Sequence, residues 1–310
     1  MSLTIVIPIF NEKKSIKVLY DQTLETLNKS GILDYEIFLV DDGSTDESWS
    51  IIEDICKIDK KVKGIKFKKN YGKSAVLNFC FRKAESDFLI TMDADLQDDP
   101  KEIPNIMNLL KDKDCVVGWK KKRLDPLIKT IPSKFFNFCN RKIFGLNLHD
   151  MNCGLKGYKK EAYKKLYVYG ELHRFIPIIL HDKGFSISEI VVNHRKRVYG
   201  KSKYGFERFL RGFLDFLTIA FTTKFSQRPN HFFGGFGVTI LFSGILIFLY
   251  LLISHFVDKS LIVRPLLFLS ISMIIVGIQI ISLGIISEII LKSSYENNDD
   301  NLEVIFKQIN

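Results

Sequence analysis

Two long stretches without a charged side chain constrain the fold of this chain more than any other feature. They run from Phe232 to Ser254 and from Leu266 to Ser287. At about 1.5 Å per helical residue, each can cross a hydrocarbon core roughly 30 Å thick. The connection between them, His255 to Pro265, is short. We therefore expect a transmembrane hairpin whose outer ends lie on one side of a bilayer, with two buried helices of a soluble domain as the alternative.

Positive charge around the hairpin indicates its orientation, because basic residues favour the cytoplasmic side. The connection carries only Lys259 and Arg264, whereas the preceding segment is rich in basic residues. We expect an integral protein of the cell inner membrane with its main domain in the cytoplasm. Apolar residues between Phe206 and Leu217 recur at helical spacing, which predicts an amphipathic helix in the lipid headgroups or packed on the core. The basic residues before the hairpin are Arg208, Arg211, Lys224 and Arg228.

Strands alternate with helices along the first two thirds of the chain, which predicts an α/β domain with a doubly wound, mainly parallel sheet. Ser44 and Glu47 have the spacing of a capping box for the helix after the second strand. The expected strands are 3–8, 35–40, 62–67, 87–92 and one that ends at Val192. The expected divisions are a cytoplasmic domain (1–204), an amphipathic juxtamembrane segment (205–230), two transmembrane helices (231–290) and a polar cytoplasmic tail (291–310).

The formal charge of +10 over 310 residues suits an anionic partner. Nucleic acid, a nucleotide sugar and an acidic membrane surface all qualify. We expect no nucleic acid, because the chain has no aromatic RNA-binding pattern.

Gly72-Lys73-Ser74 resembles the end of a P-loop, but Phe67 occupies the position of its first glycine. The five cysteines form no C-x-x-C pair, so neither a disulfide framework nor a zinc site is expected.

Clustered carboxylates after the fourth strand carry the strongest chemical signal. Asp93 and Asp95 follow that strand, with the amide of Gln97 nearby. The carboxyl edge of an open α/β sheet is where ligands bind, and hard oxygen ligands suit Mg²⁺ or Mn²⁺. A divalent ion held there could clamp a diphosphate. An acidic turn that caps the following helix is the alternative interpretation.

Six motifs in order, followed by a two-helix hairpin, resemble the family-two inverting glycosyltransferases of GT-A fold. Within that family, the chain is similar to the polyprenyl-phosphate glycosyltransferases, relatives of dolichol-phosphate mannose synthase. The resemblance covers nearly the whole chain and implies a Rossmann-like GT-A domain. The motifs are VIPIFNE (6–12), VDDGSTD (40–46), KNYGKSAVLN (69–78), MDADLQDDP (92–100), ELHRFIP (171–177) and HRKRVYGKSKYG (194–205).

The resemblance implies a role for individual residues. It places Asp93, Asp95 and Gln97 at the metal and diphosphate, and makes Asp93, Asp95 and Asp150 catalytic, with Asp150 near the reacting sugar. Phe10 stands where a tyrosine is common, and Lys69 where an arginine is common. The implied donor-binding residues are Pro8, Phe10, Glu12, Asp41, Asp42, Gly72, Asp93, Arg197 and Lys203. The residues implied to receive the lipid phosphate are Arg123, Lys129 and Ser133.

The implied reaction transfers one sugar from a UDP- or GDP-linked donor to undecaprenyl or dolichyl phosphate at the cytoplasmic leaflet, with inversion. Such a reaction belongs to the synthesis of cell-envelope glycans. A phosphate acceptor is mostly dianionic at neutral pH, so it needs little help from a general base. The alternatives are a hydroxyl acceptor on another lipid, a protein or a polysaccharide, and a non-catalytic membrane-anchored binding protein. A homo-oligomer is compatible with each of them.

Overall fold

The computed structural model describes residues 1–121, 140–195, 207–224, 229–258 and 264–297. The chain forms two compact units, Met1–Ile219 and Ala220–Asn310. Arg123, Lys129, Ser133, Arg197 and Lys203 lie outside the described residues.

The first unit is built on a seven-stranded sheet of order β3-β2-β1-β4-β6-β5-β7. Strands β3, β2, β1 and β4 run parallel to one another, and β5 is parallel to β7. Only β6 is antiparallel to both β4 and β5 among these strands. The prediction of a mainly parallel α/β sheet is therefore confirmed. The strands are β1 (Leu3–Ile9), β2 (Tyr35–Asp41), β3 (Val62–Lys66), β4 (Phe88–Thr91), β5 (Cys115–Trp119), β6 (Lys156–Lys159) and β7 (Ile187–Val191).

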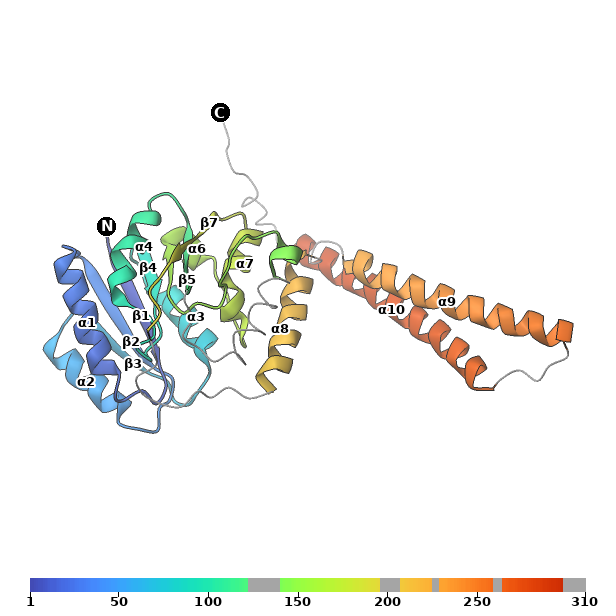
Figure 1. Ribbon diagram of the computed structural model, residues 1–310, viewed down its shortest axis with the longest axis horizontal. Coiled ribbons are helices and arrows are strands. Elements are labelled where there is room, and N and C mark those ends of the chain that lie inside the picture. Colours follow the sequence, from blue (N-terminus) through green and yellow to red (C-terminus); the bar gives the residue numbers. More distant parts are fainter. Residues whose placement is uncertain (122–139, 196–206, 225–228, 259–263, 298–310) are drawn as a thin grey trace, which may run out of the picture. The chain divides into compact units, whose positions relative to one another are not determined.

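Helices lie on both faces of this sheet (Figure 1), with α1 and α2 side by side on one face and α3 on the other. Strands covered on both faces are expected to be apolar throughout. In β1, Leu3, Ile5 and Val6 are fully buried. Residues of β1 and its neighbour β4 belong to one continuous hydrophobic core. The helices are α1 (Ile16–Lys29), α2 (Ser48–Ile58), α3 (Lys73–Lys83), η1 (Pro100–Glu102), α4 (Ile103–Leu109), α6 (Lys160–Lys164), η2 (Leu172–Phe175) and α7 (Ile176–Asp182).

The predicted capping box before α2 is wrong. The Ser44 hydroxyl accepts a hydrogen bond from the backbone N–H of Asn11 at 2.9 Å, which ties the turns after β1 and β2 together. Glu47 makes no side-chain capping bond. The Asp46 carboxylate instead accepts from the N–H of Ser48 at 3.0 Å. Ser44 is therefore committed to the sheet edge, and α2 begins one turn later than a Ser44 cap would require.

Helix α8 (Glu207–Lys224) follows the sheet, and its residues up to Ile219 belong to the first unit. Ile219 is 2% exposed, and the ring of Phe216 packs edge-on against Phe144 at 6.0 Å. Leu214 and Leu217 remain exposed. The predicted amphipathic helix thus packs on the domain through one side while leaving apolar residues uncovered on another.

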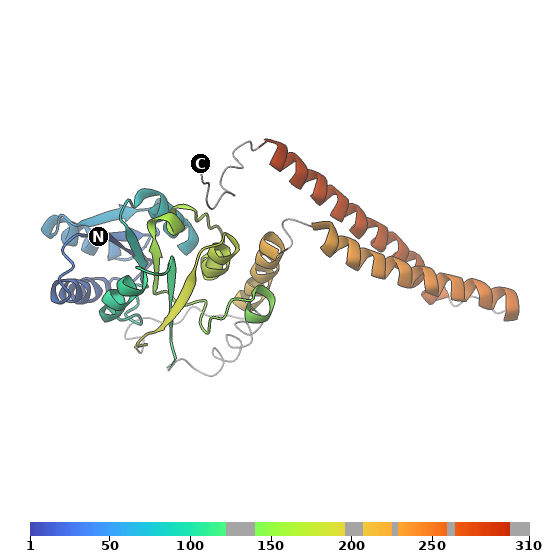
Figure 2. The same ribbon diagram turned by 90° about the horizontal axis from the view of Figure 1, so that it is seen from above.

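The second unit contains α9 (Pro229–Asp258) and α10 (Arg264–Asn297), which pack along each other (Figure 2). Their apolar spans have mean hydropathies of 2.6 and 2.5, and both are long enough to cross a membrane. Most side chains of these spans are exposed, which is not the pattern of core helices in a soluble domain. Gly277 lets the helices approach closely, since a Cβ there would lie 2.7 Å from Leu241 Cβ. The expected pair of long apolar helices is confirmed.

Candidate active site

The residues assigned to the donor site follow parallel strands that are neighbours in the sheet. Pro8 lies near the end of β1, Asp41 ends β2, and Asp93 follows β4. Because β2, β1 and β4 are adjacent and parallel, their carboxyl ends share one edge of the sheet. The fold thus gathers these sequence-predicted residues at one place.

Asp41 and Asp42 occupy this edge in different ways. Asp41 is fully buried, and one of its oxygens accepts from the N–H of Ser44 at 2.9 Å. Its other oxygen has no hydrogen-bond partner among the described residues. Asp42 accepts from the backbone N–H groups of Tyr71 (2.8 Å) and Gly72 (2.9 Å), so it fixes the turn before α3. A buried carboxylate oxygen without a donor is rare in folded proteins and indicates a place where a ligand can supply one.

The turn after β1 contains Phe10 and Glu12, both partly accessible. The backbone N–H of Glu12 donates to the hydroxyl of Ser48 at 3.0 Å, which joins this turn to the start of α2. The Glu12 carboxylate accepts from the hydroxyl of Ser15 at 3.2 Å. Asn11 between them has a positive φ of 57°, so the backbone turns sharply here. Both predicted side chains therefore lie on a turn that hydrogen bonds tie to α2.

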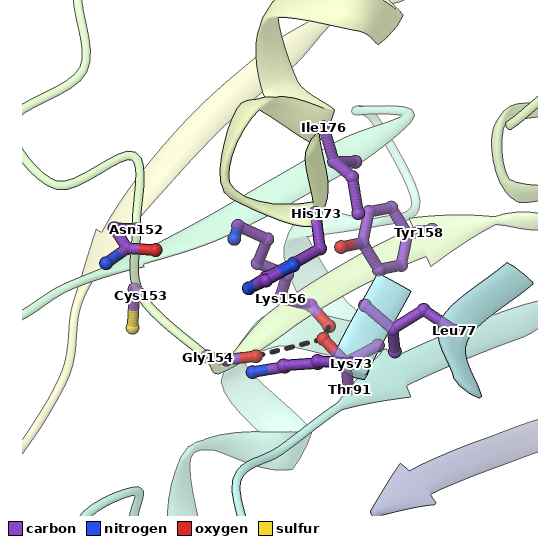
Figure 3. Close-up of a pocket in the computed structure, with 10 residues that line it drawn as sticks. All are labelled: Lys73, Leu77, Thr91, Asn152, Cys153, Gly154, Lys156, Tyr158, His173 and Ile176. Atoms are coloured by element: carbon purple, nitrogen blue, oxygen red, sulfur yellow. Dashed lines mark hydrogen bonds between the residues drawn. The ribbon is translucent and has the colours of Figure 1, made fainter. Parts of the chain in front are cut away.

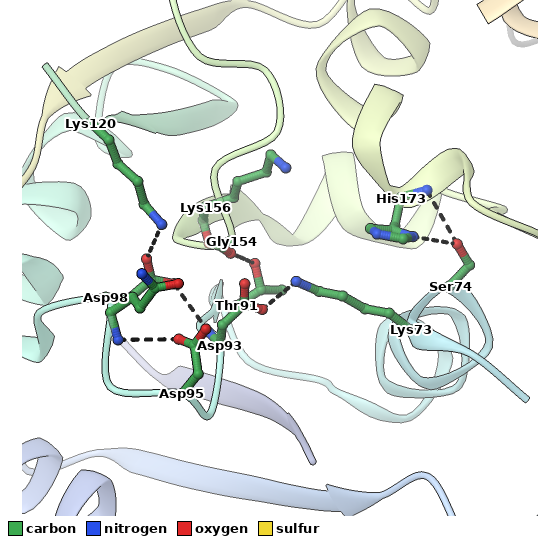
Figure 4. A network of polar contacts seen from close by, with 11 residues as sticks. Lys73, Ser74, Thr91, Asp93, Asp95, Asp98, Lys120, Gly154, Lys156 and His173 are labelled. Carbon is green, nitrogen blue, oxygen red and sulfur yellow. Dashed lines mark hydrogen bonds and ion pairs between the residues drawn. The ribbon is translucent and has the colours of Figure 1, made fainter. Parts of the chain in front are cut away.

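The loop after β4 carries Asp93 and Asp95 (Figure 4), followed by Gln97. Its partly accessible residues, Asp93, Asp95 and Gln97, alternate with buried neighbours. The N–H of Gln97 donates to Asp95 at 3.1 Å, and the N–H of Asp93 donates to Asp98 at 3.1 Å. Leu96 adopts a positive φ of 63°, which reverses the chain between the two acids and the amide. The three residues expected to hold a metal are thus brought to one short loop.

Asp93 forms a short ion pair with Lys73, the first residue of α3. Burial alone would raise the pKa of Asp93, but the neighbouring Lys73, with smaller effects from Lys120 and His173, lowers it to about 2. The Asp93 carboxylate is therefore anionic at neutral pH. It is available as a ligand for a cation that competes with Lys73.

These residues fit a divalent cation. No group of three or more His, Cys, Asp or Glu side chains that could hold a metal occurs in the described part of the chain. Mg²⁺, however, is usually bound by one or two carboxylates together with substrate phosphates and water. Asp93, Asp95 and the amide of Gln97 supply such oxygens. Gly154 leaves the space in which the Asp93 carboxylate lies, because a Cβ on Gly154 would be 2.3 Å from one of its oxygens.

A buried ion pair supports this loop from behind. Asp98 accepts a hydrogen bond from the backbone N–H of Asp93. It also pairs with Lys120 at 2.9 Å, and the side chains of Asp98 and Lys120 are 0% and 12% exposed. Burial would lower the pKa of Lys120, but Asp98 and other nearby groups raise it well above its ordinary value. The segment after β7 adds a second support, since the N–H of Arg195 donates to the carbonyl of Gln97 at 3.0 Å and its guanidinium pairs with Asp99.

We expect Lys120→Met to destabilise the protein strongly. The substitution leaves the buried Asp98 carboxylate without its cation, and breaking one partner of a buried pair costs about 3–5 kcal/mol. Denaturant unfolding can be followed by tryptophan fluorescence, since both tryptophans, Trp49 and Trp119, lie in the first unit. The double variant Lys120→Met with Asp98→Asn should recover part of the loss. An unfolding midpoint of the single variant equal to that of the wild type would contradict the importance of the pair.

Several residues of the site have no individual role in the sequence interpretation. Lys73 lies in the motif KNYGKSAVLN. Apart from that motif, the sequence singles it out only by its resemblance to the lysine of a P-loop, whose first glycine is missing here. His173 lies in ELHRFIP, and the structure places its ring nitrogen 3.0 Å from the hydroxyl of Ser74. Asp150, which the family resemblance places near the reacting sugar, is buried, and its charge raises the pKa of Lys156 of β6. Membership of a motif was the only sequence signal for Lys73 and His173, and none existed for Lys120.

The chain matches the family model "Glycosyl transferase family 2" over residues 4–167. This chain belongs to glycosyl transferase family 2. It is 34% identical to a dodecaprenyl-phosphate galacturonate synthase of Rhizobium johnstonii, over 100% of this chain and 93% of that protein. It is 33% identical to an undecaprenyl-phosphate 4-deoxy-4-formamido-L-arabinose transferase of Shewanella sediminis, over 93% and 86% of the two chains. The protein is therefore a glycosyltransferase, as the motifs indicated.

Solved glycosyltransferases share its fold. A glucosyl-3-phosphoglycerate synthase from Mycobacterium tuberculosis, solved with Mn²⁺, UDP-glucose and glycerol 3-phosphate, matches with a TM-score of 0.53 at 16% identity, covering 72% of this chain and 79% of that one. A mannosyltransferase from Pyrobaculum calidifontis, solved with GDP-mannose and Mn²⁺, matches with a TM-score of 0.51 at 19% identity, covering 71% and 63%. At these identities the likeness shows the GT-A-like fold of this glycosyltransferase, which confirms the fold prediction.

Proposed function

We propose that this glycosyltransferase transfers a single sugar from a nucleotide sugar to polyprenyl phosphate, with inversion at the anomeric carbon. The similarity over nearly the full length to two polyprenyl-phosphate sugar transferases carries this proposal. The two long apolar helices support it, because a polyprenyl acceptor resides in a membrane. The sugars that these two relatives are named for differ, one being a uronic acid and the other uncharged, so the relatives leave the sugar open.

The proposed donor site lies at the carboxyl edge of the sheet. Asp41, with its uncompensated buried oxygen, faces the nucleotide base together with Pro8, Phe10 and Glu12. Asp42 and Gly72 form the adjoining turn. Asp93, Asp95 and Gln97 would hold Mg²⁺ or Mn²⁺, whose positive charge would stabilise the diphosphate. The two structural neighbours from Mycobacterium tuberculosis and Pyrobaculum calidifontis were both solved with Mn²⁺. Asp150, Arg197 and Lys203 at the donor, and Arg123, Lys129 and Ser133 at the acceptor phosphate, keep the roles that the family resemblance implies.

The mechanism follows from the charges that develop in an inverting displacement. An oxygen of the acceptor phosphate bonds to the anomeric carbon as the bond from that carbon to the leaving diphosphate breaks. The divalent cation would neutralise the charge that the diphosphate gains. Lys73 holds the Asp93 carboxylate ionised and in place in the free enzyme. The dianionic acceptor needs no proton removed. This proposal requires no histidine base, and burial, followed by Lys73, lowers the pKa of His173 well below its ordinary value.

One assay tests the reaction. The purified full chain is incubated in detergent with Mn²⁺, a panel of UDP- and GDP-sugars, and undecaprenyl or dolichyl phosphate, and the lipid product is weighed by mass spectrometry. The proposal predicts a product heavier than the acceptor by one sugar residue. Transfer only to a hydroxyl acceptor, with polyprenyl phosphate unchanged, would rule it out.

The proposed arrangement is a catalytic domain (1–204) on the cytoplasmic side, a juxtamembrane segment (205–230), a hairpin in the inner membrane (231–290) and a cytoplasmic tail (291–310). Truncation after Arg228 is expected to leave nucleotide binding within about twofold of the wild type, because none of the proposed donor ligands belongs to the hairpin. The separate compact unit Met1–Ile219 supports this expectation. Calorimetric titration with UDP and GDP measures it. A folded truncated protein that binds neither would contradict the division.

A further inference from the structure

A small pocket lies between residues of β4, β6, α3 and η2 (Figure 3). Lys73, Thr91, Asn152, Gly154, Lys156 and His173 contribute to its lining. Lys73 and Gly154 also contact the Asp93 carboxylate. The pocket therefore shares Lys73 and Gly154 with the surroundings of Asp93. Lys156, Asn152 and His173 have no part in the proposed donor site.

Lys156 is the unusual residue of this pocket. It is the first residue of β6 and is only 5% exposed. Its amino group has no hydrogen bond or ion pair among the described residues, although its backbone carbonyl accepts from the hydroxyl of Thr91 at 3.4 Å. Figure 3 shows the amino groups of Lys156 and Lys73 directed toward the space beside Asn152 and Gly154. The residue is largely buried, and its amino group opens to a pocket without a protein partner. A charge so poorly hydrated would be stabilised by an anionic ligand in that pocket.

The other charged groups around the pocket leave Lys156 uncompensated. Lys73 is already paired with Asp93. His173 is buried and held by the hydroxyl of Ser74, and its lowered pKa makes it neutral at pH 7. Burial and the nearby charge of Lys73 lower the pKa of Lys156, while Asp150 raises it without pairing directly with it among the described contacts. An anion in the pocket would relieve both unfavourable effects on Lys156.

We infer that Lys156 binds an anionic oxygen group of a substrate other than the donor diphosphate. This inference rests on the proposed function, whose substrates offer two sources of that chemistry. One is a carboxylate on the transferred sugar, which would make Lys156 a determinant of a uronic acid donor. The other is the phosphate of the polyprenyl acceptor.

Lys156→Met in the full chain tests the inference, because methionine keeps most of the volume and removes the charge. Lys160→Met is the matched control, since Lys160 is an exposed lysine that pairs with Glu85 at the surface. Calorimetry without acceptor compares UDP, UDP-galacturonate, UDP-galactose, UDP-glucuronate and UDP-glucose. Steady-state assays then measure KM for undecaprenyl phosphate with whichever donor the wild type uses.

If Lys156 binds a sugar carboxylate, Lys156→Met should weaken binding of a uronic acid donor by at least about tenfold, the effect of one lost charge-assisted hydrogen bond. The matching hexose donor should bind as it does to the wild type. If Lys156 binds the acceptor phosphate, donor binding should be unchanged and the KM for undecaprenyl phosphate should rise by a similar factor. In either case Lys156→Arg should retain part of the wild-type value, and Lys160→Met should behave as wild type.

Two results would overturn the inference. One is a folded Lys156→Met variant with wild-type constants for every donor and for the acceptor. The other is an equal loss of affinity for UDP alone, which would assign Lys156 to the diphosphate. If the wild type transfers no sugar to polyprenyl phosphate, the proposed function fails, yet the calorimetric comparison of acidic and neutral donors still decides the role of Lys156.

A stability measurement accompanies the binding data. Lys156→Met should unfold at a temperature no lower than the wild type, because it removes an uncompensated buried charge. A marked destabilisation would instead assign Lys156 a structural role and count against the inference. If the methionine variant does not fold, Lys156→Gln in the same titrations provides the decision.

Discussion

Asp93→Asn is expected to reduce turnover by about a thousandfold or more, since several kcal/mol of transition-state stabilisation depend on an anionic ligand at this position. The substitution removes the charge that would hold a divalent cation and that pairs with Lys73. The fold should survive, because Asp93 is partly accessible and its backbone N–H still donates to Asp98. Initial rates with the best donor from the panel, measured at saturating Mn²⁺, give the comparison.

Two controls make the Asp93 result specific. Asp95→Asn should also lower turnover strongly, whereas Asp112→Asn, at an exposed turn after α4, should be neutral. Excess EDTA should abolish wild-type activity, and added Mn²⁺ or Mg²⁺ should restore it. Turnover by Asp93→Asn comparable to that of the wild type, or full wild-type activity in EDTA, would contradict the assignment of Asp93 as a metal ligand.

Gly154→Ala is expected to lower activity about a hundredfold or more without unfolding the protein, since a displacement near 1 Å of a reacting group can cost this much. A Cβ at this position would lie 2.3 Å from a carboxylate oxygen of Asp93 and 2.5 Å from its Cγ. Both distances are too short, and the Asp93 side chain can move more easily than the backbone. The atoms that must move are therefore the ones on which catalysis is proposed to depend.

Gly157→Ala provides a matched contrast for this prediction. Gly157 lies on β6 near Gly154, and its added Cβ would lie 2.4 Å from a methyl group of Ile106. That clash falls in the apolar core, so it should lower the unfolding temperature more than Gly154→Ala does. Thermal unfolding and turnover of both variants give the test. If Gly154→Ala keeps wild-type turnover, the close approach between β6 and Asp93 has no catalytic meaning.

Local sequence patterns were sufficient for the first four strands, β1 to β4, and for the two long apolar helices. The apolar run before Asp93 predicts a buried strand because a parallel strand is covered on both faces. The uncharged stretches before and after residues 255–265 predict long apolar helices because their length and lack of charge are also local properties of the sequence. Local patterns did not predict β5, nor β6, which is a short segment with Lys156 and Lys159 at its ends. Its place between β4 and β5 depends on pairing with distant strands.

The sequence alone determined that carboxylates follow a strand at the sheet edge, because the order of a strand and the residues after it is a local property. Only the tertiary structure decided which cations meet them. Lys73 of α3 pairs with Asp93, and Lys120, directly after β5, pairs with Asp98. Ser74 contacts His173 from 99 residues away. Burial of a charge and its compensation depend on all the elements packed around it. The Asp98 to Lys120 pair and the uncompensated Lys156 therefore became visible only when β4, β5 and β6 were placed side by side.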